Sequence, residues 1–209
     1  NYLLSKGFFV IGIDGMTNYY DVNLKSARNK ILKQSKKYTF IKAMINEDNV
    51  FLDICKKYNP NIIIHLAAQA GVRYSIDFPD TYFESNISGT YKILETIKKI
   101  KIDHLILAST SSVYGSNNSL PFNENQKCDK PISFYSATKI STESLSHSYS
   151  HLYNIPTTIL RFFTVYGPWG RPDMALFMFV DSIVKNKKIN VFNNGKMTRD
   201  FTYIDDIVD

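Results

Sequence analysis

Short apolar runs alternate along the chain with longer segments in which apolar residues recur at helical spacing. The runs at residues 8–13, 62–68 and 104–108 are rich in β-branched, aromatic and aliphatic residues, which predicts buried strands. In residues 81–99 the apolar positions follow a helical period, which predicts one long helix. Strands that alternate with helices in this way predict an α/β fold with a parallel sheet covered on both faces.

The rest of the chain continues this alternation. The pattern predicts helices at residues 1–6, 24–37, 49–58, 135–152 and 175–185, and strands at residues 38–41, 157–163 and 189–192. A further helix begins at Asp205 and Asp206, and residues 116–130 form a polar loop. The order of the elements predicts a Rossmann-like doubly wound parallel sheet.

Composition changes this picture little. The 209 residues include 44% apolar residues and carry a net charge of +6, mostly from scattered lysines, which favours a solvated helical face over nucleic-acid binding. No apolar run approaches the roughly 18 residues of a membrane span. Cys55 and Cys128 lie far apart and form no Cys/His cluster for a metal, which is typical of free thiols in a reducing cytoplasm.

Tyr135 and Lys139 are the first candidates for chemistry. Their four-residue spacing on a predicted helix places both side chains on one face. The lysine charge lowers the pKa of the phenol from its ordinary value of about 10, so the tyrosine can act as a base toward a sugar or alcohol hydroxyl. The same spacing also occurs where a solvated lysine lies beside a half-buried ring, so the rest of the chain must decide.

Polar and small residues follow three of the predicted strands. Asp14 ends the first, where a carboxylate would bind an adenosine ribose and repel a 2′-phosphate, which favours NAD over NADP. The small residues that end the strand at 62–68 let a cofactor approach the backbone. Hydroxyls at residues 109–112 stand where doubly wound sheets bind ligands. Asp14 and the hydroxyls also fit ordinary turns, and His65 fits a satisfied core histidine better than a base.

The Gly-rich phosphate loop of a dinucleotide-binding fold belongs one helix before Asp14, and it is absent from residues 1–209. We therefore expect the sequence to be a piece of a longer protein. Since the pyrophosphate docks on that loop, we also expect residues 1–209 alone to bind NAD poorly and not to turn over.

Several motifs point together to one family. They are Val113-Tyr114-Gly115 after the hydroxyls, the Tyr135–Lys139 pair and Arg199-Asp200-Phe201, with the longer segments Asn18 to Asp21 (NYYD), His65 to Ser75 (HLAAQAGVRYS), Leu160 to Ala175 (LRFFTVYGPWGRPDMA) and Asn194 to Val208 (NGKMTRDFTYIDDIV). The chain thereby resembles, over nearly its whole length, the extended short-chain dehydrogenases/reductases that act on nucleotide sugars. The resemblance implies an NAD-binding Rossmann domain at residues 1–164 and the start of a nucleotide-sugar-binding domain at residues 165–209.

The resemblance also implies a role for each matching residue. Tyr135 is the base at the sugar 4-hydroxyl, Lys139 lowers its pKa and holds the nicotinamide ribose, and Thr110 hydrogen-bonds the 4-oxygen. The residues implied to bind NAD are Asp14, Asn18, Leu66, Ala67, Ala68, Asn86, Ser109, Tyr135, Lys139 and Phe162. Those implied to bind the UDP-sugar are Ser111, Ser112, Arg73, Thr164, Arg171, Asn193 and Arg199, of which Arg199 would neutralise the pyrophosphate.

Two residues depart from the family pattern near the adenine. Met44 stands where an acidic residue usually meets the adenine after the third strand, and Gly15 stands where relatives often carry Asn. Both departures bear on adenine affinity rather than on the chemistry.

The implied reaction is NAD-dependent 4-epimerisation of a UDP-sugar through a 4-keto intermediate, and conversion of UDP-glucuronate to UDP-galacturonate is favoured. Epimerisation of UDP-glucose or UDP-N-acetylglucosamine, decarboxylation of UDP-glucuronate, and an inactive fragment or nucleotide-sugar-binding module stay open. A 4,6-dehydratase is disfavoured because it needs an acid and a base after Thr110, where Ser111 and Ser112 stand. The resemblance further implies a cytoplasmic homodimer in polysaccharide biosynthesis, without nucleic-acid or membrane partners.

An epimerase for UDP-glucuronate must hold the sugar carboxylate out of the alignment that favours loss of carbon dioxide. Thr164 stands where galactose epimerases carry Asn, and its hydroxyl could bind this carboxylate together with Ser111 and Ser112. Arg171 could add a positive charge, directly or by ordering its loop. Alternatively, Thr164 caps a turn and Arg171 pairs with a surface acid such as Asp173.

Overall fold

The computed structural model describes residues 1–196 and 198–209, apart from the side chains of Phe192 and Asn193. The chain forms two units. Unit 1 comprises Asn1–Val10, Met16–Phe40 and Phe163–Asp209, and unit 2 comprises Ile11–Gly15 and Ile41–Phe162. The junction at residue 163 lies next to the boundary predicted at residue 164. The division into a cofactor domain and a sugar domain stays a prediction.

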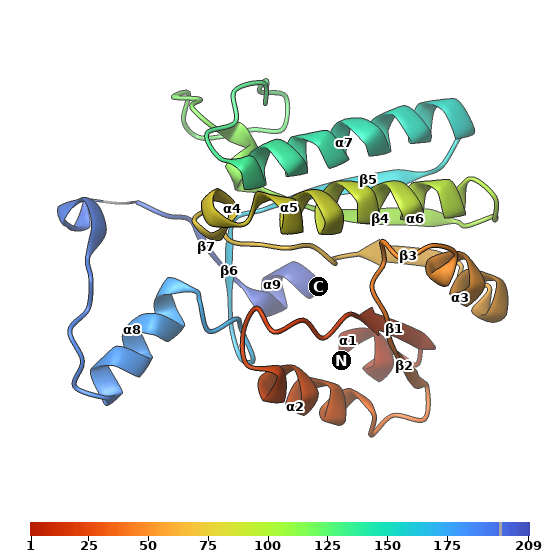
Figure 1. The fold of residues 1–209 in the computed structure, drawn as a ribbon, viewed down its shortest axis with the longest axis horizontal. Coiled ribbons are helices and arrows are strands. Elements are labelled where there is room, and N and C mark those ends of the chain that lie inside the picture. The colour runs from red at the N-terminus through yellow and green to blue at the C-terminus, as the bar shows by residue number, and fades with distance from the viewer. Residues whose placement is uncertain (197) are drawn as a thin grey trace. The chain divides into compact units, whose positions relative to one another are not determined.

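The central sheet of unit 2 consists of three parallel strands in the order β3-β4-β5. These are β3 (Ile62–His65), β4 (His104–Thr110) and β5 (Thr157–Phe162), as predicted in type and place (Figure 1). At the end of β4, Thr110 lies opposite Phe162 of β5. Because the strands are parallel, their carboxyl ends meet at one edge of the sheet, where ligands bind in open α/β folds.

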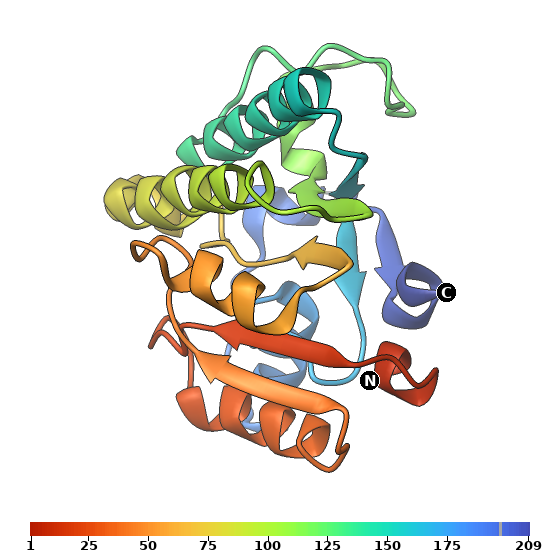
Figure 2. The same ribbon diagram turned by 90° about the vertical axis from the view of Figure 1, so that its right-hand side faces the viewer.

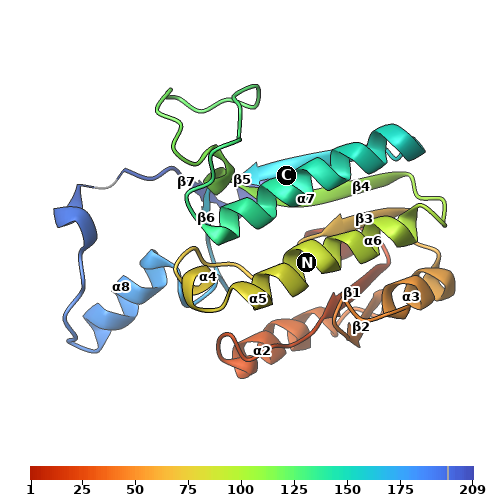
Figure 3. The same ribbon diagram turned by 45° about the horizontal axis from the view of Figure 1, so that its top comes forward.

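Two helices lie side by side over one face of this sheet, α6 (Gly89–Ile97) and α7 (Phe134–Tyr153) (Figure 3). The core between them and the strands is made by buried apolar side chains, among them Ile63, Ile93, Leu94, Ile97 and Leu105. The helix α3 (Val50–Tyr58) adds Phe51 and Cys55 to this core. Burial alternates along β3, so that Ile63 is buried while Ile62 and Ile64 are exposed.

The long helix predicted at residues 81–99 is divided. It follows α4 (Tyr74–Asp77), which the apolar pattern did not predict, and consists of α5 (Pro79–Tyr82), the π-helical segment η1 (Phe83–Ser88) and α6. Asn86 lies in η1 with 1% of its surface exposed. A wide π turn inside a helix is commonly retained for a functional reason, and here it carries a buried amide that bonds two other segments.

The strands β1 (Val10–Asp14) and β2 (Tyr38–Lys42) form a two-stranded sheet (Figure 2). Both were predicted, with bounds shifted by one or two residues. The helix α2 (Val22–Leu32) ends five residues before its predicted end at residue 37. The Ser35 hydroxyl accepts a hydrogen bond from the Lys37 backbone N–H at 3.2 Å, and such local bonds compete with a helix.

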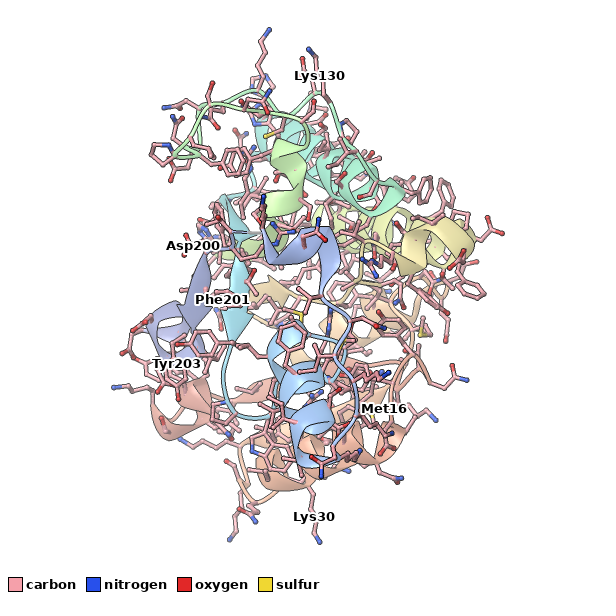
Figure 4. The ribbon with its side chains drawn as sticks, turned by 90° about the vertical axis from the view of Figure 1, so that its left-hand side faces the viewer. Met16, Lys30, Lys130, Asp200, Phe201 and Tyr203 are labelled. Atoms are coloured by element: carbon pink, nitrogen blue, oxygen red, sulfur yellow. The ribbon has the colours of Figure 1, made fainter. Side chains whose placement is uncertain are left out.

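The other elements of unit 1 are α1 (Tyr2–Ser5), β6 (Thr164–Tyr166), α8 (Ala175–Val184), the short 3₁₀ helix η3 (Phe192–Gly195), β7 (Phe201–Tyr203) and α9 (Ile204–Val208). The strand predicted at residues 189–192 is wrong, because this stretch is irregular and runs into η3. Instead, residues after Asp200 form β7, which pairs in parallel with β6 (Figure 4). The aromatic rings of Phe201 and Tyr203 both contact Tyr166, which stabilises that pairing.

None of the helices in residues 1–196 and 198–209 combines the length and the apolar character that a bilayer span requires.

Candidate active site

Tyr135 is held in the first turn of α7. This helix begins with a capping box, in which the Ser133 hydroxyl accepts from the Ser136 backbone N–H at 3.1 Å and the Ser136 hydroxyl accepts from the Ser133 N–H at 3.3 Å. The backbone N–H of Tyr135 donates to the hydroxyl of Ser75 at 3.2 Å. Ser75 is buried and was not singled out in the sequence, although it lies in the segment HLAAQAGVRYS. These bonds fix the position of Tyr135 relative to the short helix α4.

Lys139 lies one helical turn after Tyr135, and only 5% of its surface is exposed. Burial lowers its pKa from 10.5 to about 8, and the nearby carboxylate of Glu143 opposes this shift. Lys139 therefore stays largely protonated at neutral pH. A buried positive charge one turn from a phenol favours the phenolate, as the proposed base requires.

The hydroxyl cluster at the end of β4 adjoins the same helix, because α7 packs on both β4 and the short 3₁₀ helix η2 (Ser111–Tyr114). The hydroxyl oxygen of Thr110 accepts from the Ser112 backbone N–H at 3.2 Å and thereby caps η2. Thr110 is buried, whereas Ser111 and Ser112 are half-buried. Tyr135, Lys139 and Thr110 thus all belong to unit 2, the first two on α7 and Thr110 at the end of the strand β4 that α7 packs against.

Gly115 ends η2 with a backbone that other residues rarely adopt. Its φ is +55°, and a Cβ there would lie 2.0 Å from the carbonyl oxygen of Lys130. Lys130, in the loop before α7, is labelled in Figure 4. The glycine of the Val113-Tyr114-Gly115 motif therefore allows this loop to close against η2.

Asn86 acts on the loop after β3 rather than exposing its amide. Its Oδ1 accepts from the Gln69 backbone N–H at 2.7 Å, and its Nδ2 donates to the Gln69 carbonyl at 3.1 Å and to the Thr138 hydroxyl at 3.0 Å. The adjacent Tyr82 donates to the Ala70 carbonyl at 2.9 Å, and its ring contacts Tyr135 with centroids 6.0 Å apart. The Asn86 amide thereby joins the loop after β3 to α7, and its implied contact with NAD stays a prediction.

His65 is the satisfied core histidine that the sequence favoured. It is buried, and its Nε2 lies 3.0 Å from the Thr90 hydroxyl. Burial, with a smaller contribution from the charge of Lys139, lowers its pKa from 6.5 to about 3. It is therefore neutral throughout the physiological range and lies behind the site as a packed side chain.

The residues predicted to bind NAD in unit 2 fit a dinucleotide. Asp14 is an exposed carboxylate at the carboxyl end of β1, where it suits a ribose and would repel a 2′-phosphate. Leu66 is exposed, and Ala67 and Ala68 are half-buried with small side chains that leave the backbone accessible beyond β3. Ser109 and Phe162 lie at the ends of β4 and β5, whereas the exposed Asn18 belongs to unit 1.

The two departures at the adenine position are coupled. A Cβ at Gly15 would lie 2.0 Å from the sulfur of Met44, so the Met44 side chain already occupies the space of any side chain at residue 15. The absence of a side chain at Gly15 is therefore the steric counterpart of a long apolar side chain at Met44. Because the two residues lie far apart in the sequence, this steric relation is visible only in the structure.

The predicted UDP-sugar residues divide between the units. Ser111, Ser112 and the exposed Arg73 belong to unit 2, whereas Thr164, Arg171, Asn193 and Arg199 belong to unit 1. Thr164 and Arg171 line one small cavity in unit 1. Arg199 donates to the Thr198 carbonyl at 3.0 Å and is exposed, and the side chain of Asn193 lies outside the described part. The binding roles of these residues stay predictions.

Arg171 makes the ion pair that the sequence left open as an alternative. Its Nε and Nη2 donate to the two carboxylate oxygens of Asp173 at 2.9 and 3.0 Å. The Tyr19 hydroxyl donates to the same carboxylate at 3.0 Å. Asp173 thus ties Arg171 to the NYYD segment, which orders the loop after β6.

Comparisons with known proteins agree with this geometry. The model of the NAD dependent epimerase/dehydratase family matches residues 1–209. A probable UDP-glucuronate 4-epimerase from Rhizobium meliloti (strain 1021) is 53% identical over 208 residues, which cover 99% of this chain and 61% of that protein. The chain thus spans about three fifths of that relative's length.

Solved structures give the same result for the fold. The UDP-glucuronic acid 4-epimerase from Bacillus cereus, in complex with UDP-glucuronic acid and NAD, is 38% identical with a TM-score of 0.91, over 99% of this chain and 64% of that one. The UDP-glucose 4-epimerase from Thermotoga maritima, with UDP-glucose, is 28% identical with a TM-score of 0.87, over 99% and 65% of the two chains. The predicted Rossmann-like fold class is confirmed.

Proposed function

The chain belongs to the NAD-dependent epimerase/dehydratase family, and from this premise we propose that the protein catalyses NAD-dependent 4-epimerisation of a UDP-sugar, converting UDP-glucuronate to UDP-galacturonate. The observation that carries the proposal is the Tyr135–Lys139 pair beside the hydroxyls that end β4, with Lys139 buried and largely protonated at neutral pH. The similarity to proteins named UDP-glucuronate 4-epimerases supports the choice of substrate.

The chain's own residues supply proton transfer and orientation. The phenolate of Tyr135 removes the proton of the sugar 4-hydroxyl. It returns the proton after the 4-keto sugar has rotated so that its opposite face is presented. Lys139 holds the phenolate form through its charge, and the Thr110 hydroxyl orients the 4-oxygen. NAD, held by the residues implied to bind it, would supply reversible hydride transfer at C4 of the sugar. The cycle is redox-neutral, so no external reductant is consumed.

The test is product identification. Full-length protein is mixed with NAD and, separately, with UDP-glucuronate, UDP-glucose or UDP-N-acetylglucosamine, and products are followed by NMR. We expect UDP-galacturonate from UDP-glucuronate and much slower change in the other two. Conversion of UDP-glucose or UDP-N-acetylglucosamine alone would overturn the substrate, and release of carbon dioxide with a pentose product would replace epimerisation by decarboxylation.

Control of the sugar carboxylate provides a second prediction. If Arg171 restrains the carboxylate, Arg171→Ala and Thr164→Val should shift the product from UDP-galacturonate toward a decarboxylated pentose or 4-keto pentose. Because Arg171 is paired with Asp173, the variant Asp173→Asn separates two mechanisms. The same shift in Asp173→Asn means that Arg171 acts by ordering the loop, whereas no shift means that its charge acts directly.

The measurement is the ratio of the two products by mass spectrometry. Slower epimerisation in the Arg171 and Thr164 variants, without any gain of decarboxylated product, would show that these residues do not control the carboxylate.

We also propose that the protein acts as a cytoplasmic homodimer. Support for a homodimer comes from the exposed apolar surface on the two outer helices of unit 2, at Tyr91 of α6 and at Leu152 and Tyr153 of α7. Support for the cytoplasm comes from Cys55 and Cys128, which are both free thiols. Sedimentation of the full-length protein tests the first point.

A further inference from the structure

A half-buried carboxylate lies one helical turn beyond the proposed catalytic pair. Glu143 is on α7, one turn after Lys139, and its side chain is 13% exposed. Its Oε1 accepts a short hydrogen bond from the Ser109 hydroxyl and another from Arg161 Nε at 3.1 Å. Its Oε2 accepts from Arg161 Nη2 at 2.8 Å. The carboxylate is thus held from two sides, by a hydroxyl and by a bidentate guanidinium.

These contacts join three elements at one point. Ser109 and Arg161 are opposite each other in the register of β4 and β5, and Glu143 reaches both from α7. The Arg161 guanidinium lies over the ring of Tyr114 at 5.2 Å and donates to the Glu124 carbonyl at 3.3 Å. The network therefore also includes η2 and the loop after it. Ser109 directly precedes Thr110, the hydroxyl implied at the sugar 4-oxygen.

We propose that Glu143, held by Arg161, is a positioning residue of the reaction, which fixes the end of β4 against α7 and so sets the Thr110 hydroxyl relative to Tyr135 and Lys139. This inference rests on the proposed epimerase function. Glu143 reaches the reacting atoms through Ser109 and through its charge, and its substitution should affect chemistry more than substrate binding.

Electrostatics adds a second consequence of the same geometry. Burial lowers the pKa of Lys139 to about 8, and Glu143 is the group that opposes this. Other ionisable groups around this pair include His65 of β3, which burial keeps neutral, Tyr135 on the same helix, and Arg161 of β5, which donates to Glu143. Loss of the Glu143 charge removes the opposing anion and leaves the Arg161 cation uncompensated. Both changes lower the pKa of Lys139.

The experiment compares Glu143→Gln with a matched control, Glu95→Gln. Glu95 is a partly exposed carboxylate on α6 that also bonds a cation, Lys98, and a hydroxyl, Tyr149, and it lies outside the proposed site. In full-length protein, kcat and KM for UDP-glucuronate are measured against pH, and Lys139 is titrated by NMR of its side-chain nitrogen, assigned with Lys139→Arg.

In Glu143→Gln we expect kcat to fall with little change in KM. The alkaline limb of kcat and the Lys139 titration should both move to lower pH by about one unit, the order of magnitude expected when one neighbouring charge is lost. Glu95→Gln should leave both midpoints unchanged. Ser109→Ala removes the hydroxyl contact with Glu143 and is measured at saturating NAD, because Ser109 is also implied to bind the cofactor. It should lower kcat without moving the Lys139 titration, and it remains informative if Glu143→Gln does not fold.

Three outcomes would overturn the inference: unchanged kcat and unchanged Lys139 titration in Glu143→Gln, equal shifts in Glu95→Gln, or unchanged kcat in Ser109→Ala. Failure of the wild-type protein to epimerise UDP-glucuronate would instead refute the proposed function. In that case the Lys139 titration still decides whether Glu143 sets the charge of the site.

Discussion

Replacement of Tyr135 by phenylalanine is expected to lower kcat at least ~100-fold while the affinity for the UDP-sugar changes little. The phenylalanine ring keeps the edge contact with Tyr82 and removes only the hydroxyl that acts as base. By transition-state arithmetic, this loss corresponds to about 2.7 kcal/mol of barrier. The measurement is kcat by coupled or NMR assay, with UDP-sugar affinity by calorimetry.

Tyr153→Phe is the matched control for this change. Tyr153 is the last residue of the same helix, is 44% exposed and lies far along α7 from Tyr135. We expect its kcat to stay within twofold of the wild-type value. A Tyr135→Phe protein that turns over at a near-normal rate would show that another group removes the proton.

Local patterns in the sequence predicted most of the fold, because each depends on residues near in the chain. The strand at β4 follows from an apolar run, and the helix α7 follows from helical spacing. The prediction of a strand at residues 189–192 is wrong because a strand needs a partner, and β6 pairs with residues 201–203. Partner choice depends on residues far apart, which a local pattern does not contain.

In the candidate site, too, the sequence predicts relations within one helix but not contacts between separate segments. The pair Tyr135 and Lys139 follows from helical spacing, and that spacing extended by one turn leads to Glu143, so this residue could have been found. The relation of Gly15 to Met44 could not, because it depends on the contact of two segments. The hydrogen bonds of Asn86 to Gln69 and Thr138 could not be predicted either, since the sequence shows a polar residue in a helix but not its hydrogen-bond partners.

Asn86→Leu is expected to destabilise unit 2 strongly. Leucine has the same number of side-chain heavy atoms and the same branch point as asparagine. It leaves the Gln69 backbone N–H and carbonyl and the Thr138 hydroxyl without their present partner. An unsatisfied buried polar group costs about 1–3 kcal/mol, so leaving the two backbone groups of Gln69 unsatisfied lowers the free energy of unfolding by about 2–6 kcal/mol. Asn61→Leu is the matched control, because Asn61 is exposed and its amide bonds only the exposed Asp103 among the described residues.

The free energy of unfolding is measured by urea denaturation without NAD, and NAD affinity is measured separately by calorimetry. A positioning role predicts that Asn86→Leu lowers both quantities, because the loop after β3 loses its anchor before any ligand binds. The stability and NAD affinity of Asn86→Asp should lie between those of the wild type and those of Asn86→Leu. The aspartate carboxylate still accepts from the Gln69 backbone N–H but cannot donate to the Gln69 carbonyl or to Thr138. A variant with normal stability and weaker NAD binding would mean that the amide contacts the cofactor directly, and that the hydrogen bonds to the loop are dispensable.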